Sequence, residues 1–470
     1  MKVHLSGIAG TAMASLAGLL RERGHAVTGS DQDVYPPMST QLQELGIPVR
    51  SPYAAANVPE DADLVVIGNA LSRGNPEVEA VLDRKQRMTS LPALLAEEFI
   101  RGKTSLVVAG THGKTTTTSI LAFLLHRAGL DPSFLIGGVP VDFERSYRLG
   151  AGPHMVLEGD EYDCAFFDKR PKFVHYMPDV AVIGNVEYDH ADIYPDLASV
   201  QRAFVHLLNL VPSRGLVVAG LETPALREIL PRAHCPVETF GLSAEADWRA
   251  VEVRPSQAGW RFRLLRKGRD LGDFDLPLAG EHNLRNALAA LAVAAAAGLE
   301  PEDARAALAA FRGVKRRLEV RGRARGVVVY DDFAHHPTAV RETLRALRAA
   351  LQPGSGRLVA VFEPRSYTSR TRVFQEEFAR AFQDADTVIV AAAHLPAKVP
   401  EGQRLSETAL VGAIAELGKD ARFVPAVDDI VRGLAADLRE GDQVVVLSNG
   451  GFGGIHDKLL RALQSAATGR

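Results

Sequence analysis

The chain has 470 residues, of which 46% are hydrophobic and 24% charged, and its formal net charge is −3. This length predicts two to four domains, and the composition is that of an ordinary globular protein. The slightly negative charge argues against a nucleic-acid partner bound mainly through its phosphates.

Cysteine usage and hydropathy indicate a cytoplasmic protein. Cys164 and Cys235 lie far apart and form no metal-binding or redox spacing, so both are expected to be reduced thiols. The first residues contain no apolar segment typical of a signal peptide, and the apolar stretch 287–299 is too short to cross a bilayer. We therefore expect a cytoplasmic protein without membrane insertion.

The first block, residues 1–103, alternates strand and helix patterns, which predicts a parallel, doubly wound sheet. Strands are predicted at 3–5, 26–28 and 64–68, and a helix at 12–23. The turn 7–13 after the first strand is similar to a dinucleotide fingerprint, but alanines replace its second and third glycines. With Asp31 at the end of the second strand, the turn suits a nucleotide diphosphate better than NAD. A purely structural turn is the alternative.

The second block, residues 104–318, opens with the strongest motif of the chain. The apolar run 105–109 is followed by Gly110, Thr111, His112, Gly113, Lys114, Thr115 and Thr116. A strand that ends in a glycine turn and a helix that opens with lysine and threonine form a phosphate cradle. The turn is shorter than the usual P-loop, whose first glycine would stand where this chain has Val108. ATP is the ligand that this motif predicts.

Two polar segments follow buried strands of the same block. Residues 158–163 contain four acids after the strand 154–157, which favours a hard cation such as Mg²⁺ over a solvated acidic loop. Asp189 and His190 follow the strand 180–183 and offer a further metal ligand or a donor to a phosphoryl group.

The rest of the block contains another strand, an antiparallel region and an alanine-rich helix. The strand is predicted at 215–218, the region 247–275 alternates like antiparallel strands, and the helix follows His282.

The third block, residues 319–470, restarts the alternation, with strands predicted at 326–330, 358–362, 387–390 and 444–447. His335 and His336 follow the first of these strands. Arg365 and Arg370 follow the second and could clamp carboxylates of a peptide-like substrate. A glycine loop at 448–456 suits close backbone approach, and a flexible turn is its alternative. The polar stretches 101–103 and 321–323 are the expected linkers.

In this order, these motifs resemble the Mur ligase family of ATP-dependent, amide-forming enzymes of cell-wall synthesis. The resemblance covers essentially the whole chain. It implies a three-domain α/β architecture with an N-terminal Rossmann-like UDP-binding domain, a central P-loop ATPase domain and a C-terminal Rossmann-like domain for the amine substrate. The domains are expected at 1–103, 104–318 and 319–470.

Two branches of the family are similar to this chain. One joins L-alanine to UDP-N-acetylmuramate. The other attaches the tripeptide L-alanyl-γ-D-glutamyl-meso-diaminopimelate to the same sugar in peptidoglycan recycling. The segments 158–176, 189–193 and 449–456 look like the tripeptide branch, which is the preferred reading. The partners expected are therefore these small molecules, with no nucleic acid, and the chain is expected to be a monomer or a weak homodimer.

The resemblance also implies roles for individual residues. Beside the P-loop, ATP contacts are expected from Asn286 (adenine), Arg317 (phosphate) and Asp332 (ribose). Mg²⁺ is expected on Thr115, Glu158 and His190, with Lys114, Glu158 and His190 as the catalytic residues. UDP-sugar contacts are expected from Gly7, Ala9, Gly10, Thr11, Asp31 and Ser72, and peptide contacts from His335, His336, Arg365 and Arg370.

Two other functions remain as alternatives. An NAD-dependent oxidoreductase would explain the first glycine turn, although the missing glycines and the P-loop count against it. A non-catalytic ATP-binding switch would explain the P-loop without any turnover of the cell-wall substrates.

Overall fold

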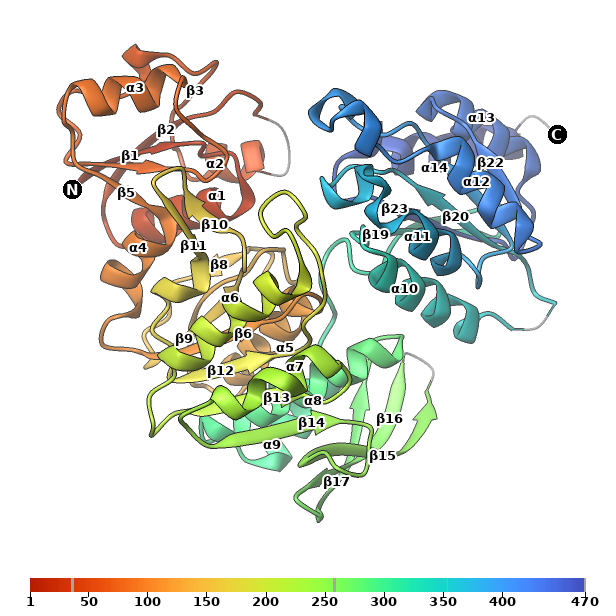
Figure 1. Cartoon of the computed structure of the whole chain (residues 1–470). Coiled ribbons are helices and arrows are strands. Elements are labelled where there is room, and N and C mark those ends of the chain that lie inside the picture. The colour runs from red at the N-terminus through yellow and green to blue at the C-terminus, as the bar shows by residue number, and fades with distance from the viewer. Residues whose placement is uncertain (35–37, 257–258, 353, 469–470) are drawn as a thin grey trace. The chain divides into compact units, whose positions relative to one another are not determined.

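The computed structural model describes residues 1–34, 38–256, 259–352 and 354–468 and contains three large α/β sheets (Figure 1). The chain divides into two compact units, each described separately below. The first unit holds residues 1–188, 196–277 and 284–312, and the second holds 189–195, 278–283 and 313–470. None of the helices in the described part of the chain combines the length and the apolar character needed to span a bilayer.

The first sheet has the strand order β3-β2-β1-β4-β5, and all its neighbours are parallel. Its strands are β1 (Lys2–Ser6), β2 (Ala26–Ser30), β3 (Val49–Arg50), β4 (Leu64–Ile67) and β5 (Met88–Ser90). The helices are α1 (Thr11–Glu22), α2 (Met38–Glu44), α3 (Pro76–Asp83) and α4 (Leu91–Leu95). This confirms the doubly wound parallel sheet predicted for the first block.

The second sheet has ten strands in the order β17-β16-β15-β14-β13-β12-β6-β9-β7-β8. The parallel centre consists of β7 (Ser133–Leu135), β9 (His154–Gly159), β6 (Thr104–Ala109), β12 (Val180–Ile183), β13 (Leu216–Gly220) and β14 (Val237–Gly241). One edge strand is β8 (Tyr147–Arg148), and the far edge is the meander β15 (Trp248–Pro255), β16 (Trp260–Arg266) and β17 (Arg269–Leu276). The meander is antiparallel, as the alternation of polar and apolar residues predicted.

Several helices and a separate two-stranded hairpin accompany this sheet. The helices are α5 (Lys114–Arg127), α6 (Leu197–Leu210), α7 (Pro224–Ile229), α8 (Glu281–Ala296) and α9 (Pro301–Ala309). The hairpin consists of β10 (Asp163–Ala165) and β11 (Asp168–Pro171). The alanine-rich helix predicted after His282 is therefore α8, with its buried leucine and alanine side chains.

The third sheet has the order β18-β19-β23-β20-β21-β22, in which only β18 is antiparallel to its neighbour. Its strands are β18 (Glu319–Ala324), β19 (Val327–Asp332), β20 (Leu358–Phe362), β21 (Thr387–Val390), β22 (Asp420–Phe423) and β23 (Gln443–Leu447). Its helices are α10 (Pro337–Ala350), α11 (Gln375–Ala381), α12 (Glu407–Glu416), α13 (Val427–Asp437) and α14 (Ile455–Thr468).

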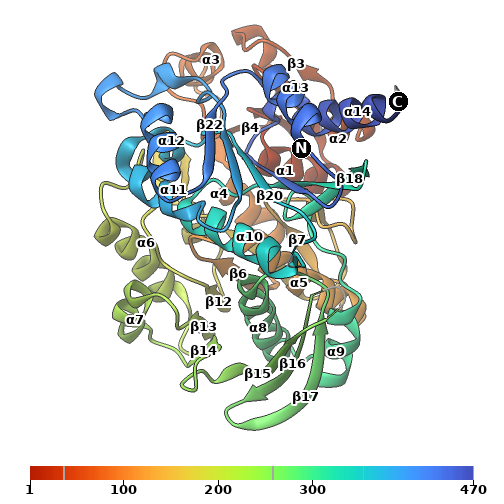
Figure 2. The same ribbon diagram turned by 90° about the vertical axis from the view of Figure 1, so that its right-hand side faces the viewer.

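Two apolar layers sandwich the third sheet. The helices α10, α11 and α12 pack on one face, and α13 and α14 pack on the other (Figure 2). The polar stretch 321–323, predicted as a linker, lies instead within β18. It is polar because β18 is an edge strand whose side chains are mostly solvent-accessible.

The first two sheets are joined within one unit by a close contact between α1 and β8. An added Cβ at Gly18 would lie 2.1 Å from a ring carbon of Tyr147, so the ring packs directly on the helix backbone. Next to this contact, the hydroxyls of Ser15 and Ser146 lie 2.6 Å apart, and Glu22 accepts the backbone N–H of Leu149 at 3.1 Å. The absence of a side chain at Gly18 is therefore a packing requirement.

We predict that Gly18→Ala destabilises the first unit even though alanine is the better helix former. Overpacking of this kind costs about 1–3 kcal/mol, so the thermal unfolding midpoint is expected to fall by several degrees. Gly433→Ala is the control, because Gly433 also lies in a helix but an added Cβ there has no neighbour within 4 Å. Equal effects of the two substitutions would contradict the packing argument.

Candidate active site

The loop between β6 and α5 has the backbone that a phosphate cradle requires. Gly110 and Gly113 have φ angles of +133° and +80°, which side-chain-bearing residues rarely adopt. An added Cβ at Gly113 would lie 2.3 Å from Oδ1 of Asn286, a residue of α8. The Asn286 amide therefore lies against the loop at the N-terminus of α5, where backbone N–H groups attract anions.

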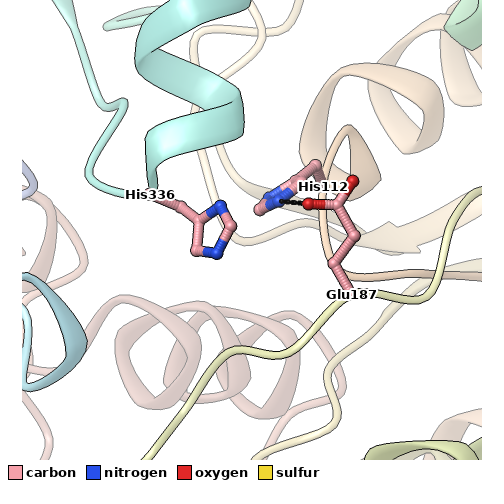
Figure 3. A group of neighbouring side chains, drawn as sticks. All are labelled: His112, Glu187 and His336. Atoms are coloured by element: carbon pink, nitrogen blue, oxygen red, sulfur yellow. Dashed lines mark ion pairs between the residues drawn. The ribbon is translucent and has the colours of Figure 1, made fainter. Parts of the chain in front are cut away.

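The neighbouring strand β12 braces this loop. Residues 106–109 of β6 pair in parallel with 180–183 of β12, so both strands end at the same level. Asn185 then accepts the N–H of Thr111 on its backbone oxygen (3.1 Å) and the N–H of His112 on its side-chain oxygen (2.8 Å). Beside it, the His112 ring and the Glu187 carboxylate form an ion pair at 3.4 Å (Figure 3).

Lys114 is nearly buried and points back over its own loop. Its Nζ donates to the backbone oxygen of Gly110 (2.8 Å) and to both carboxylate oxygens of Glu161 (3.0 and 2.7 Å). Burial alone would lower the pKa of Lys114, but Glu161 and the nearby carboxylates raise it above its ordinary value. The ammonium is therefore charged at neutral pH and lies at the position where a phosphate cradle needs it.

Thr115 and Glu158 form the oxygen cluster that the sequence predicts for Mg²⁺. The Thr115 hydroxyl donates to Oε1 of Glu158 at 3.0 Å, and Oε2 of Glu158 accepts the N–H of Gly137 at 2.7 Å. Thr115 comes from α5 and Glu158 from β9, the strand directly beside β6. A hydroxyl and a carboxylate are hard ligands, so this pair fits Mg²⁺ chemically.

The other three acids of the run pair with lysines. Glu161 pairs with Lys114, Asp160 with Lys172 at 2.5 Å, and Asp163 with the exposed Lys169 at 2.6 Å. Lysines of the chain thus pair with these three acids, and the expectation that the acidic run favours a bound cation stays a prediction. Glu158 alone keeps the predicted proximity to Thr115.

In and next to the β10–β11 hairpin, three further side chains could bind a metal by their chemistry, but they already interact with groups of the chain. Cys164, Asp168 and His175 have ligand atoms within 4.8 Å of one another. The Asp168 carboxylate, however, already accepts three hydrogen bonds from Arg170, two of them from the guanidinium, and lies 2.8 Å from Nε2 of His175. Burial, the largest influence, raises the pKa of Cys164 to about 12, so the thiol is protonated at neutral pH.

The segment 189–195 belongs to the second unit. There, the hydroxyl of Thr368 donates to Oδ1 of Asp189 at 2.9 Å, and Oδ1 of Asp189 also accepts the N–H of His190. His190 has a left-handed φ of +54°. Its predicted roles as metal ligand and catalytic residue stay predictions.

Arg317 and Asp332 also lie in the second unit. The Arg317 guanidinium lies 5.1 Å from the centre of the Phe333 ring. Asp332 is buried and accepts the N–H groups of Leu318 (2.7 Å) and Ala334 (2.9 Å). Burial raises the pKa of Asp332, and Arg317 opposes this shift.

The two histidines after β19 shape the start of α10. His336 caps the helix, since its Nδ1 accepts the N–H of Thr338 at 3.3 Å. The Nδ1 of His335 lies 2.9 Å from the backbone oxygen of Phe333, and burial, the largest influence, lowers the pKa of His335.

The two arginines after β20 differ in their surroundings. Arg370 is buried, and its guanidinium donates to the backbone oxygens of Ser366, His394 and Leu395 at 2.9–3.2 Å. Arg365 lies against the 448–456 glycine loop, where an added Cβ at Gly450 would be 1.9 Å from its Nε. Arg365 is thus the more accessible of the two predicted carboxylate-binding side chains.

The predicted UDP-sugar contacts gather at the carboxyl ends of β1, β2 and β4. The N–H groups of Gly7 and Ile8 donate to the Ser30 backbone oxygen at 2.8 and 3.1 Å. Asp31 accepts the N–H of Ala9 (2.8 Å) and the hydroxyl of Tyr53 (2.9 Å), so its carboxylate already orients the turn. Gly10 and Thr11 lie at the exposed start of α1, and Ser72 in the exposed loop before α3.

Sequence reasoning missed three residues that shape the phosphate loop: Asn185, Glu187 and Glu161. Asn185 and Glu187 follow β12 immediately, so the expected parallel pairing of β12 with β6 was a usable signal. Glu161 likewise follows β9, the other parallel neighbour of β6, but the sequence does not show which acid of the run meets Lys114.

Comparisons with known proteins agree with this architecture. Three family descriptions match in succession: "Mur ligase family, catalytic domain" at 2–102, "Mur ligase middle domain" at 108–294 and "Mur ligase, glutamate ligase domain" at 316–450. The chain is 43% identical, over 99% of both chains, to the UDP-N-acetylmuramate–L-alanyl-γ-D-glutamyl-meso-2,6-diaminoheptandioate ligase of Escherichia coli strain K12.

Two further relatives represent the two branches. A UDP-N-acetylmuramate–L-alanine ligase of an Anaeromyxobacter species is 37% identical over 99% of this chain and 98% of its own length. The crystal structure of a murein peptide ligase from Psychrobacter arcticus superimposes with a TM-score of 0.75, at 38% identity over 99% of each chain. The family is therefore established, and its members are ATP-dependent, amide-forming ligases. This chain belongs to the Mur ligase family.

Proposed function

We propose that the chain is an ATP-dependent ligase that joins L-alanyl-γ-D-glutamyl-meso-diaminopimelate to UDP-N-acetylmuramate in peptidoglycan recycling. The observation that carries the chemistry is the cluster of Lys114, Thr115 and Glu158, where the neighbouring strands β6 and β9 end and α5 begins. The choice of amine substrate is supported by the full-length relative that is 43% identical and is named for this tripeptide.

The reaction transfers a phosphoryl group and then forms an amide. The UDP-N-acetylmuramate carboxylate attacks the γ-phosphorus of ATP, a new O–P bond forms, and ADP leaves. The tripeptide α-amine then attacks the acyl carbon, and inorganic phosphate leaves with the former carboxylate oxygen. The protein contributes mostly position and charge to such a transfer.

The residues of the central loop have distinct roles in this proposal. Lys114 exchanges its contact with Glu161 for the terminal phosphates, and the loop N–H groups from Gly110 to Thr116 hold the phosphate chain. Thr115 and Glu158, with His190, would hold Mg²⁺, which when bound neutralises charge on the phosphates. Asn286 would contact adenine.

The remaining contacts are proposed for Arg317, at the end of the central domain, and for the two outer domains, with boundaries at 1–103, 104–318 and 319–470. Arg317 and Asp332 would contact phosphate and ribose. His335, His336 and Arg365 would contact the tripeptide, with Arg370 shaping their loop. The first-domain turn and Ser72 would contact the UDP-sugar. Because ATP and nucleotide sugars are cytoplasmic metabolites, we also propose a cytoplasmic location, and a monomer or weak homodimer stays a prediction.

The substrate assignment predicts which amine supports phosphate release. With ATP, Mg²⁺ and UDP-N-acetylmuramate, kcat/KM for the tripeptide is expected to exceed that for L-alanine by about a hundred-fold or more, because peptide contacts beyond the first residue add binding energy. Phosphate release and mass spectrometry of the product measure this. Turnover with L-alanine alone would assign the chain to the other branch.

The loop geometry predicts that Gly113→Ala weakens ATP binding by at least about ten-fold, since the new Cβ requires strained backbone and displaces Asn286. Gly129→Ala is the matched control. Gly129 follows the other end of α5 with a φ of +77°, but an added Cβ there has no neighbour within 4 Å. Calorimetric titration with ATP should therefore separate the two variants, and equal losses of affinity would contradict the proposed cradle.

The metal assignment predicts that Glu158→Gln lowers kcat by about a hundred-fold and raises the Mg²⁺ concentration needed for half-maximal rate, because a charged oxygen ligand is lost. Asp163→Asn is the control from the same acidic run, where the carboxylate pairs with Lys169. It is expected to keep a rate near that of the wild type and an unchanged Mg²⁺ dependence. A Glu158→Gln enzyme with wild-type Mg²⁺ dependence would remove Glu158 from the metal site.

A further inference from the structure

A carboxylate is fully buried beneath the first glycine turn. Glu77 is the second residue of α3, and its exposed fraction is 0%. A buried charge of this kind is costly unless donors surround it. Glu77 has no role in the function proposed above, so its burial and its hydrogen bonds need a separate explanation.

Both oxygens of Glu77 are fully engaged. Oε2 accepts the hydroxyls of Ser6 (2.6 Å) and Ser30 (2.5 Å). Oε1 accepts the Asn57 side-chain amide (2.9 Å) and the Ala54 backbone N–H (3.3 Å). The position of Glu77 in the first turn of α3 adds a favourable helix dipole.

The ionised form of Glu77 is the one that these contacts stabilise. Burial alone would raise the pKa of Glu77, but the His4 ring, 3.9 Å away, and hydrogen bonds from Ser30, Ser6 and Asn57 lower it to about 2. The carboxylate therefore stays charged throughout the neutral pH range. Hydrogen bonds to a charged acceptor are roughly twice as strong as neutral ones, so this network is a rigid one.

Three partners of Glu77, namely Ser6, Ser30 and Ala54, adjoin residues of the predicted nucleotide-sugar site or residues that hold it. Ser6 precedes Gly7, and Ser30 precedes Asp31 along the chain. The Ser30 backbone oxygen accepts two N–H groups of the glycine turn. Ala54 follows Tyr53, whose hydroxyl donates to Asp31. One carboxylate thus ties together the ends of β1 and β2, the loop after β3 and the start of α3.

We propose that Glu77 is a positioning residue for the nucleotide-sugar site: it sets the relative placement of the glycine turn and Asp31, the proposed contacts of the UDP moiety, and of Tyr53, which donates to Asp31. This inference rests on the proposed function, because that function supplies the ligand. It adds a residue that does not touch the ligand and acts through the ends of β1 and β2.

The direct test replaces the charge while keeping the shape, in the full-length protein. Glu77→Gln is expected to raise the Kd and the KM for UDP-N-acetylmuramate by about ten-fold, the loss of one strong hydrogen bond. The KM for ATP and the kcat at saturating UDP-N-acetylmuramate should not change. Asp83→Asn is the control, because Asp83 is an exposed carboxylate at the other end of the same helix.

A second variant separates a loss of positioning from a loss of folded protein. Ser6→Ala removes one donor to Glu77 without altering charge, and it is expected to raise the same Kd by a smaller factor while ATP binding stays normal. A lower kcat with unchanged KM values in both variants would indicate only a smaller folded fraction and would overturn the positioning role. Unchanged UDP-N-acetylmuramate affinity in both variants would overturn it as well.

The wild-type protein separates this inference from the proposed function. If it binds UDP-N-acetylmuramate calorimetrically but shows no turnover with the tripeptide, the proposed reaction fails, and the effect of Glu77→Gln on binding still decides the role of Glu77. If the wild type turns over the tripeptide and Glu77→Gln binds the sugar normally, only the positioning role fails. A wild type that does not bind the sugar overturns both.

Discussion

The candidate site of the central sheet depends on the common register of three parallel strands. Ala109, the last residue of β6, lies opposite Gly159 of β9 on one side and Ile183 of β12 on the other. The chain segments that leave these strands therefore emerge at one level. This register brings Glu158 to Thr115 and Asn185 to His112, although each pair is separated by more than 40 residues in sequence.

Charge balance within this site depends on Lys114 and Glu161. An isolated ammonium that is only 12% exposed would lose its proton readily, since burial favours the neutral amine. Glu161 reverses that tendency, and the lysine keeps its charge without a ligand. A phosphate can replace Glu161 as a partner without a change in protonation, so the site is electrostatically prepared for a polyanion.

Much of this organisation could be predicted from the sequence, because strand periodicity and glycine turns are local signals. The strand, glycine turn and helix around residues 110–113, the parallel strands and the antiparallel meander were all predicted correctly. The acidic run was harder, because its charges are balanced by Lys114, Lys169 and Lys172, and sequence spacing does not reveal which lysine meets which acid. The polar edge strand β18 was mistaken for a linker for a related reason, since an edge strand and a loop are both solvated.

The two nucleotide-type loops of the first unit are held in different ways. Between β6 and α5, the backbone itself approaches Asn286, and only glycine fits at Gly113. Between β1 and α1, the second and third glycines of the fingerprint are missing. Asp31 there accepts the N–H of Ala9, and the Ser30 carbonyl accepts those of Gly7 and Ile8. Side-chain and carbonyl acceptors can thus define a turn that glycines define elsewhere. Nucleotide binding by such a turn depends on where its N–H groups point, and acceptors distant in sequence can set that direction as firmly as glycine does. A partial fingerprint is therefore weak evidence against nucleotide binding.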